Sequence, residues 1–278
     1  MKYKQILLSS IKTPIKQPLL FFPSIALFLT NTILILLFLS VTGLLPLLTQ
    51  NPAIIFEQDL QTIINYLQLN FESNLLNILI TFIGFVVINF LVGSGLLAMK
   101  FGLIKEVAKK RKITLRKAVQ SGKKYTFRII KLKVFVFVCM ALLILILNSI
   151  FPRLLSISNS IIFVTLTYFM IKVSYQIINF ILLFRYPILL TKNKGVFFTI
   201  KETFRFFKSK TKFVIATWII IFIITTITTL FLLFLNTSLT ATLTYGLVIF
   251  LIIKSLTDII ISLWQDIFLF FVYFFKEK

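Results

Sequence analysis

The sequence predicts an all-α membrane protein, a polytopic bundle of six transmembrane helices. Three observations lead to this fold class. First, 59% of the 278 residues are hydrophobic and only 14% are charged, whereas about a quarter of the residues in soluble domains carry a charge. Second, no Lys or Arg occurs between Lys16 and Lys100, and thirteen then occur from Lys100 to Lys133. Third, the apolar stretches show no period-two alternation, and only helices satisfy the backbone over such lengths in lipid.

The predicted spans are close to, or longer than, the roughly 20 helical residues that cross the hydrocarbon layer. In chain order they cover 19–42, 75–99, 133–151, 160–184, 213–235 and 243–266, so that residues 1–278 form a single transmembrane domain. The first span begins beside Pro18 and has Pro23 within its first turns, where the missing proline N–H costs least. Its apolar stretch is too long for a cleavable signal peptide, so we expect it to remain as a helix.

The charges of the loops predict the orientation. Segment 43–74 contains three acidic residues and no basic one, loop 152–159 has a single arginine, and loop 236–242 has no charge. Because positively charged loops stay in the cytoplasm, the Lys- and Arg-rich segments face inward. The sequence therefore predicts a multi-pass protein of the cytoplasmic membrane with both termini in the cytoplasm.

We also expect amphipathic helices at the membrane surface, at 3–12, 57–69, 114–128 and 196–208. In the helix at 196–208, Phe197, Ile200 and Phe204 share one face, while Lys201 and Arg205 lie mostly on the other faces. Basic helices of this kind lie in the headgroup plane. The residues expected to contact anionic headgroups are Lys109, Lys110, Arg111, Lys112, Arg116, Lys117, Lys123, Lys124, Lys201, Arg205 and Lys208.

The spacing of these elements predicts an internal repeat of three copies, each with an interfacial helix, a span outward and a span back. An offset of 83 residues takes Asn89 in the second span to Lys172 in the fourth, and a further 82 residues reaches Lys254 in the sixth. Residue identity between the copies is low, so the prediction depends on the spacing of elements.

Polar residues inside the apolar spans are the candidates for a functional site. These are Lys172, Lys254, Asp258, Asn89, Gln176 and Asn179. A charge at the bilayer centre costs about 2.5–3.5 kcal/mol, which makes such residues candidates for function. Lys254 and Asp258 are four residues apart and can pair on one helix face. The sequence is compatible with an anion or proton site around Lys172, with purely structural pairing, and with hydrogen bonds that hold helices together.

Enzyme motifs are missing from the sequence. There is no histidine, which removes His-based acid–base catalysis and His metal ligands, and the single Cys139 lies in an apolar run. The eight acidic residues form no Asp-rich metal set, and no Gly-rich phosphate loop is present. We therefore expect no enzyme activity, cofactor or metal.

Ser94, Ala98 and Gly102 are small residues spaced four apart, and this spacing predicts a seam where two helices pack closely.

Several segments carry a family resemblance. An N-terminal amphipathic helix leads into Gln17–Pro23, and Arg185–Pro187, Lys194–Gly195 and the helix Thr199–Lys208 lead into the fifth span. This pattern resembles the poorly characterised six-helix membrane proteins of archaea and bacteria, which are similar to the membrane domain fused to some glycerophosphodiester phosphodiesterases. The resemblance implies the six-helix architecture and no catalytic residues, because the catalytic barrel of those enzymes is missing here.

The expected function is that of a non-enzymatic membrane protein that binds or organises anionic lipid. Membrane lipids, and not nucleic acid, are the expected partners, because the basic residues lie beside the spans. The alternative is a transporter or permease subunit for a small or anionic substrate. In that case a separate ATPase subunit or a second copy of the chain is a further expected partner.

Overall fold

The computed structural model describes residues 3–42, 60–155, 160–242 and 246–277, which contain helices and no strand. Six helical segments within this part of the chain are long and apolar enough to cross a membrane: Pro18–Val41, Leu75–Ala108, Leu115–Ile146, Phe169–Lys192, Thr211–Leu239 and Ile249–Lys276. The predicted all-α fold is therefore confirmed, and the six apolar helices are those that a multi-pass membrane protein requires.

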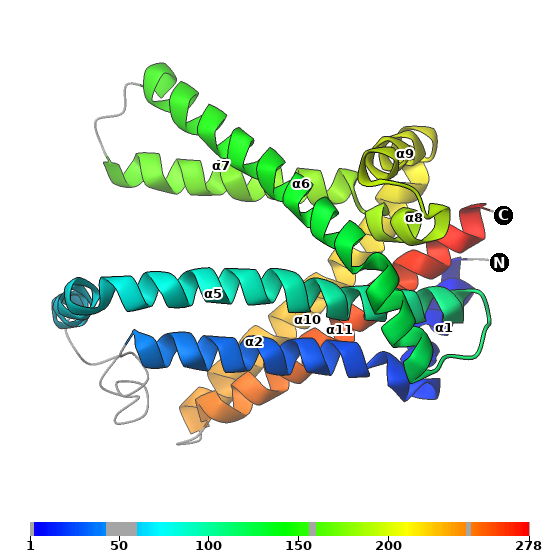
Figure 1. The fold of residues 1–278 in the computed structure, drawn as a ribbon, viewed down its shortest axis with the longest axis horizontal. Helices are drawn as coiled ribbons and strands as arrows, with labels where there is room; N and C mark the ends of the chain where they lie inside the picture. Colours follow the sequence, from blue (N-terminus) through cyan, green and yellow to red (C-terminus); the bar gives the residue numbers. More distant parts are fainter. Residues whose placement is uncertain (1–2, 43–59, 156–159, 243–245, 278) are drawn as a thin grey trace.

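The long helices form three antiparallel pairs (Figure 1). The pairs are α2 (Phe22–Val41) with α5 (Leu60–Ala108), α6 (Leu115–Leu155) with α7 (Ser160–Ile181), and α10 (Thr211–Thr242) with α11 (Gly246–Glu277). All three pairs come together at the end of the molecule where both termini lie. Toward the other end, α6 and α7 separate from α2 and α5 (Figure 1).

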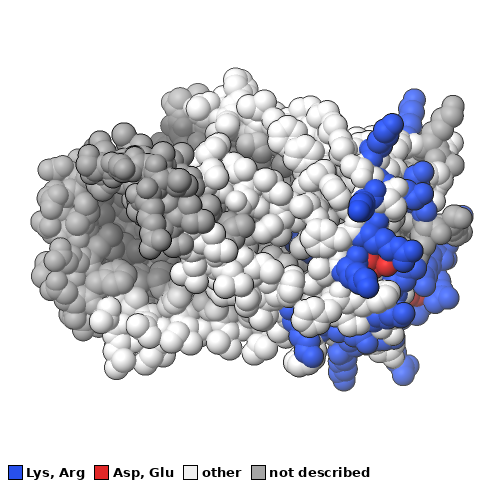
Figure 2. Space-filling view, turned by 90° about the horizontal axis from the view of Figure 1, so that it is seen from above, with Lys and Arg blue, Asp and Glu red and all other residues white. Residues whose placement is uncertain are grey.

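Shorter helices occupy the end where the pairs meet. They are α1 (Tyr3–Lys16), the 3₁₀ turn η1 (Pro18–Leu20), α8 (Arg185–Lys192) and α9 (Val196–Ser209). Figure 2 shows that the Lys and Arg side chains gather at this same end, with very few acidic groups among them. The charged surface and the two termini therefore lie on one side of the apolar helices.

The protein core also lies at the basic end. One cluster of buried side chains joins α5, α6, α8 and α11 and includes Phe101, Ile129 and Leu189. A second cluster joins α1, α10 and the last turns of α11. Away from this end the helices are little covered by protein: Leu76 is 73% exposed and Phe234 is 70% exposed. Because burying apolar area away from water is favourable, we take hydrocarbon to be what covers this surface.

Helix α1 packs against the protein through polar as well as apolar contacts. The Tyr3 hydroxyl donates a hydrogen bond to the Phe213 carbonyl over 3.2 Å, and the Trp264 indole N–H donates to the Ser10 hydroxyl over 3.0 Å. Burial raises the pKa of the Tyr3 hydroxyl, and its hydrogen bond with Thr217 opposes that shift. The helix predicted at 3–12 thus extends to Lys16 and has one face buried on α10 and α11.

Helices α5 and α6 pack closely against each other in the core. Ser94, Ala98 and Gly102 are buried on α5, and a Cβ atom built on Gly102 would overlap the Ser121 side chain of α6. Small residues let two backbones approach in this way. The turn between the two helices includes Lys110, which adopts a left-handed conformation with φ 57°.

The helix boundaries differ from the predicted ranges at several points. The segment predicted as a separate helix at 114–128 is the first part of α6, which runs without interruption into the apolar span. For 57–69, residues 57–59 lie outside the described residues, and 60–69 begin the continuous helix α5. The predicted span 160–184 ends earlier, at Ile181, and is followed by α8, which was not predicted.

The helix predicted at 196–208 corresponds to α9 (Val196–Ser209). Ile200 and Thr203 are buried on one side of it, whereas Phe197 is 80% exposed and Lys201 and Arg205 are also exposed. Of the apolar residues predicted to share a face, Ile200 packs into the core and Phe197 lies on the surface. The sequence pattern did not distinguish contact with protein from contact with lipid.

Candidate functional site

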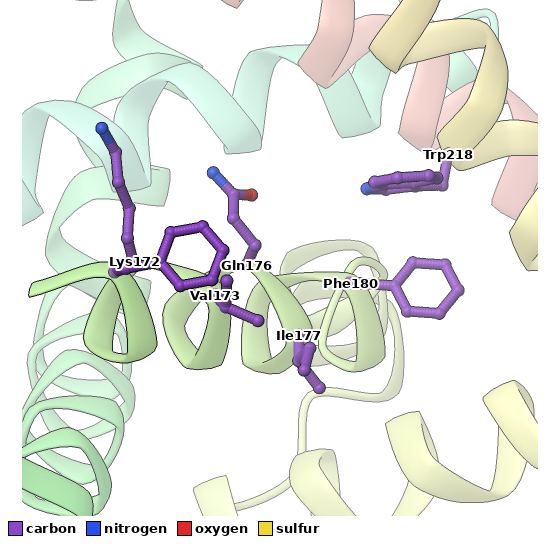
Figure 3. Close-up of a pocket in the computed structure, with 7 residues that line it drawn as sticks. Lys172, Val173, Gln176, Ile177, Phe180 and Trp218 are labelled. Atoms are coloured by element: carbon purple, nitrogen blue, oxygen red, sulfur yellow. The ribbon is translucent and has the colours of Figure 1, made fainter. Parts of the chain in front are cut away.

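Lys172 and Gln176 line an open groove of about 440 Å³ between α7 and α10, whose other lining residues are apolar. Figure 3 shows both side chains projecting from the same side of α7, with Phe180 opposite Trp218 of α10 at one end of the groove. The Phe180 and Trp218 ring centroids are 5.3 Å apart in an edge-to-face arrangement. The groove is therefore an apolar channel along the protein surface with a cation and an amide on one wall.

Lys254 and Asp258 form an ion pair on α11, with Nζ and Oδ2 3.0 Å apart and side chains 49% and 59% exposed. The predicted pairing of these two residues is present. Among the described residues, the lining of the α7–α10 groove includes Lys172 and Gln176 but neither Lys254 nor Asp258. The α7–α10 groove therefore contains one of the two lysines and not the other.

The two asparagines predicted for the site lie elsewhere. Asn89 donates a hydrogen bond from its amide to the side-chain oxygen of Asn31 on α2, over 3.1 Å, which links α2 to α5. Asn179 accepts a hydrogen bond from the Arg185 guanidinium over 2.9 Å. The first contact matches the role of polar residues that hold helices together in lipid, and the second places Asn179 beside a cation.

Asn179 and Arg185 line a second pocket, of about 430 Å³, which we call the α5–α8 pocket. Its lining residues are Phe90, Leu132, Lys133, Val136, Phe137, Met140, Tyr175, Asn179, Arg185 and Tyr186. Four helices supply them: α5, α6, α7 and α8. The pocket thus combines two cations, an amide and two phenols with a wall of apolar side chains.

Contacts with aromatic rings hold the two cations of this pocket in place. The Lys133 ammonium lies 5.7 Å from the centre of the Phe90 ring, and the Arg185 guanidinium lies 5.0 Å from the centre of the Tyr186 ring. A cation within about 6 Å of a ring face is attracted to it. Neither Lys133 nor Arg185 has an ion pair with a carboxylate among the interactions found in the described residues.

A buried ion pair lies deeper in the core. Lys100 of α5 is 2.6 Å from the Asp266 carboxylate of α11, and their side chains are only 5% and 21% exposed. The Lys100 ammonium also donates to the Ser262 hydroxyl over 3.1 Å. Because both the ion pair and this hydrogen bond join α5 to α11, they fix how the first and third helix pairs are joined.

The basic residues predicted to contact headgroups all lie at the end that carries both termini. Lys109–Lys112 form the turn after α5, Arg116, Lys117, Lys123 and Lys124 lie in the first turns of α6, and Lys201, Arg205 and Lys208 lie on α9. All but the half-buried Lys117 are exposed. Their positions allow them to meet a charged membrane surface or a soluble anion.

Sequence reasoning missed Lys133, Arg185, Lys100 and Asp266. The signal available for Lys133 was its place at the start of an apolar run, next to Phe135 and Phe137, where a lysine must reach back to the interface. Lys100 and Asp266 each lie at the edge of a predicted span, and nothing in a single sequence shows that such distant residues meet.

Within the described part of the chain, no group of three or more Cys, Asp or Glu side chains could hold a metal ion. No family model, curated protein or solved structure matches this chain. The arguments for function therefore rest on the pockets and charges themselves.

Proposed function

We propose that the protein binds an anionic membrane lipid in the α5–α8 pocket and has no catalytic activity. The observation that carries the proposal is that two cations, Lys133 and Arg185, line the same pocket as five apolar side chains. A phospholipid has the matching chemistry, with a negative phosphate next to long hydrocarbon chains. Charge-assisted hydrogen bonds to phosphate are stronger than neutral ones.

The arrangement of the two halves of the pocket supports this occupant. Arg185 is the first residue of α8 at the basic end, and Phe137 and Met140 lie further along α6, in its apolar part. A lipid with its phosphate at the basic end would place its acyl chains along α6. Arg185, already bonded to Asn179, retains further N–H donors for a phosphate oxygen.

The proposed orientation places the basic end and both termini in the cytoplasm. The excess of Lys and Arg at that end (Figure 2) supports it, because positively charged segments stay inside. The cytoplasmic leaflet is anionic and attracts each nearby basic residue by about 1 kcal/mol. Exposed cations on α9 and at the start of α6 would then face anionic headgroups of the inner leaflet.

We further propose that the three helix pairs are copies of one repeat. Each pair follows a basic helical segment: α1 before α2, the first turns of α6 before its apolar part, and α9 before α10. This order supports the repeat expected from element spacing, and it fits the proposed similarity to six-helix proteins related to the membrane domains of glycerophosphodiester phosphodiesterases.

A transporter or permease subunit is the second candidate. The groove with Lys172 and Gln176 favours it, because ionisable residues within spans mark substrate pathways in transporters. A separate ATPase subunit or a second copy of this chain would then be needed as a partner. Copurification of an ATPase with the full chain would support this candidate over lipid binding.

The test of lipid binding compares two double variants. Lys133→Gln with Arg185→Gln removes both cations of the pocket. Lys131→Gln with Lys192→Gln removes two exposed cations from the same two helices, outside the pocket lining. Each protein is extracted in mild detergent, mixed with phosphatidylglycerol and phosphatidylcholine, and analysed by native mass spectrometry.

We expect the wild type and the control to retain phosphatidylglycerol in preference to phosphatidylcholine. The affinity of the pocket variant for phosphatidylglycerol should fall about tenfold or more, since a hydrogen bond to a charged group contributes about 1.5–3 kcal/mol. The single variant Lys133→Gln keeps the hydrogen bond between Arg185 and Asn179. Weaker binding by this variant therefore cannot be explained by misfolding that follows from loss of that bond. Equal retention by the wild type and both pocket variants would refute the proposal.

A further inference from the structure

A third hollow, of about 360 Å³, lies at the corner between the end of α5 and the start of α6. We call it the corner pocket. It is lined by Lys105, Glu106, Lys109, Arg111, Lys117, Gln120, Ser121, Lys124 and Tyr125, and it shares no residue with the α5–α8 pocket. Five of its nine lining residues are therefore cations, and one is a carboxylate.

Helix geometry explains why so many cations face one hollow. Lys109 follows the end of α5 directly, and its backbone N–H bonds to the Lys105 carbonyl one turn earlier, so both lysines lie on one side of the helix end. Lys117 and Lys124 are seven residues apart on α6 and share one face of that helix. The close crossing at Gly102 and Ser121 brings these two faces together. The cations thus converge because of the fold, whereas an extended basic surface would spread them apart.

The only carboxylate of the pocket compensates little of this charge. The Glu106 oxygen is 3.9 Å from Arg111 and 4.0 Å from Lys117, which are long separations for ion pairs. Lys105 is more firmly held, since its ammonium donates to the Leu190 carbonyl over 2.7 Å and to the Tyr125 hydroxyl over 3.1 Å. A cation held in place at Lys105, with the exposed cations Lys109, Arg111 and Lys124 in the same lining, would suit an anion with several negative charges.

We infer that the corner pocket binds a phosphate-bearing anion with two or more negative charges. Three properties fit this ligand class: the excess of cations, a lining that is mostly polar, and a volume that admits a diphosphate but no folded macromolecule. Lysines and arginines arranged in this way bind phosphate oxygens by charge-assisted hydrogen bonds. The phosphate could belong to a soluble molecule or to a lipid headgroup that carries a phosphate monoester.

The experiment uses the full chain in neutral detergent, with inorganic pyrophosphate as the soluble probe and calorimetry at constant ionic strength as the measurement. The pocket variant is Lys109→Gln with Lys124→Gln. The matched control is Lys201→Gln with Arg205→Gln, which removes the same charge from exposed positions of α9. A parallel arm measures binding of phosphatidic acid to each protein in phosphatidylcholine nanodiscs.

We expect saturable binding that the pocket variant weakens about tenfold or more and the control leaves within about twofold. Binding of pyrophosphate would identify a soluble ligand, and binding of phosphatidic acid alone would identify a headgroup; either supports the inference. Gln120→Glu, which adds a negative charge and removes no cation, should also weaken binding. No saturable binding in either arm, or equal weakening by pocket and control variants, would overturn the inference.

The outcome is independent of the lipid proposal. Substitutions in the corner pocket leave Lys133 and Arg185 unchanged, so phosphatidylglycerol retention by the α5–α8 pocket should persist in the Lys109→Gln, Lys124→Gln protein. Failure at one site therefore does not imply failure at the other.

Discussion

Removing the carboxylate of Asp266 should strongly destabilise the protein, because it leaves Lys100 charged and enclosed. At a separation of 2.6 Å the Coulomb attraction is about 6 kcal/mol for an effective dielectric constant of about 20. Much of this attraction offsets the cost of removing both charges from water. What remains after loss of one partner is the cost of an uncompensated buried charge, about 3–5 kcal/mol. We therefore expect Asp266→Asn to lower the free energy of unfolding by about that amount, measured by reversible SDS titration followed by circular dichroism.

Two further variants test the reasoning behind this number. The double variant Lys100→Met, Asp266→Leu removes both charges and should recover most of the lost stability, because apolar replacements of buried pairs are often neutral. As a control, Arg111→Gln breaks a 3.9 Å pair in which Arg111 is 64% exposed, and it should cost less than about 1 kcal/mol. The explanation fails if Asp266→Asn stays within about 1 kcal/mol of the wild type, or if the double variant is no more stable than the single one.

Two other predictions concern packing and orientation. Gly102→Ala places a methyl group against Ser121 and should lower the free energy of unfolding by about 1–3 kcal/mol. Gly84→Ala, with no atom within 4 Å of the added Cβ, should be neutral or stabilising by up to about 1 kcal/mol; comparable losses in both SDS titrations would contradict the packing argument. In a Cys139→Ser background, Gly195→Cys should react with a membrane-impermeant thiol reagent in inverted vesicles but not in intact cells, and labelling in intact cells would reverse the proposed orientation.

The architecture could be predicted from the sequence because lipid imposes simple rules. About 20 apolar residues are needed to cross the hydrocarbon layer, and this requirement alone located the six spans. The pairing of Lys254 with Asp258 followed from a four-residue spacing within one helix. These features depend only on neighbours along the chain, which a single sequence displays directly.

The pockets could not be predicted, because they depend on which helices meet. Arg185 was predicted to follow the fourth span, but its place in one pocket with Lys133 requires α8 to fold back against α5. Asn89 was expected near Lys172, whereas the structure bonds it to Asn31. An apolar stripe indicates that a face is buried, but it does not indicate whether protein or lipid buries it.

The position of the core has a consequence for biosynthesis. The buried side chains that complete both clusters come from Leu263 to Tyr273, so they leave the ribosome after every other helix has been made. Until then α1 lacks Trp264, the donor to Ser10, and Lys100 lacks Asp266. Before α11 is made, the first two helix pairs can already pack together through α5 and α6, and the last helix then adds the buried side chains that complete both clusters.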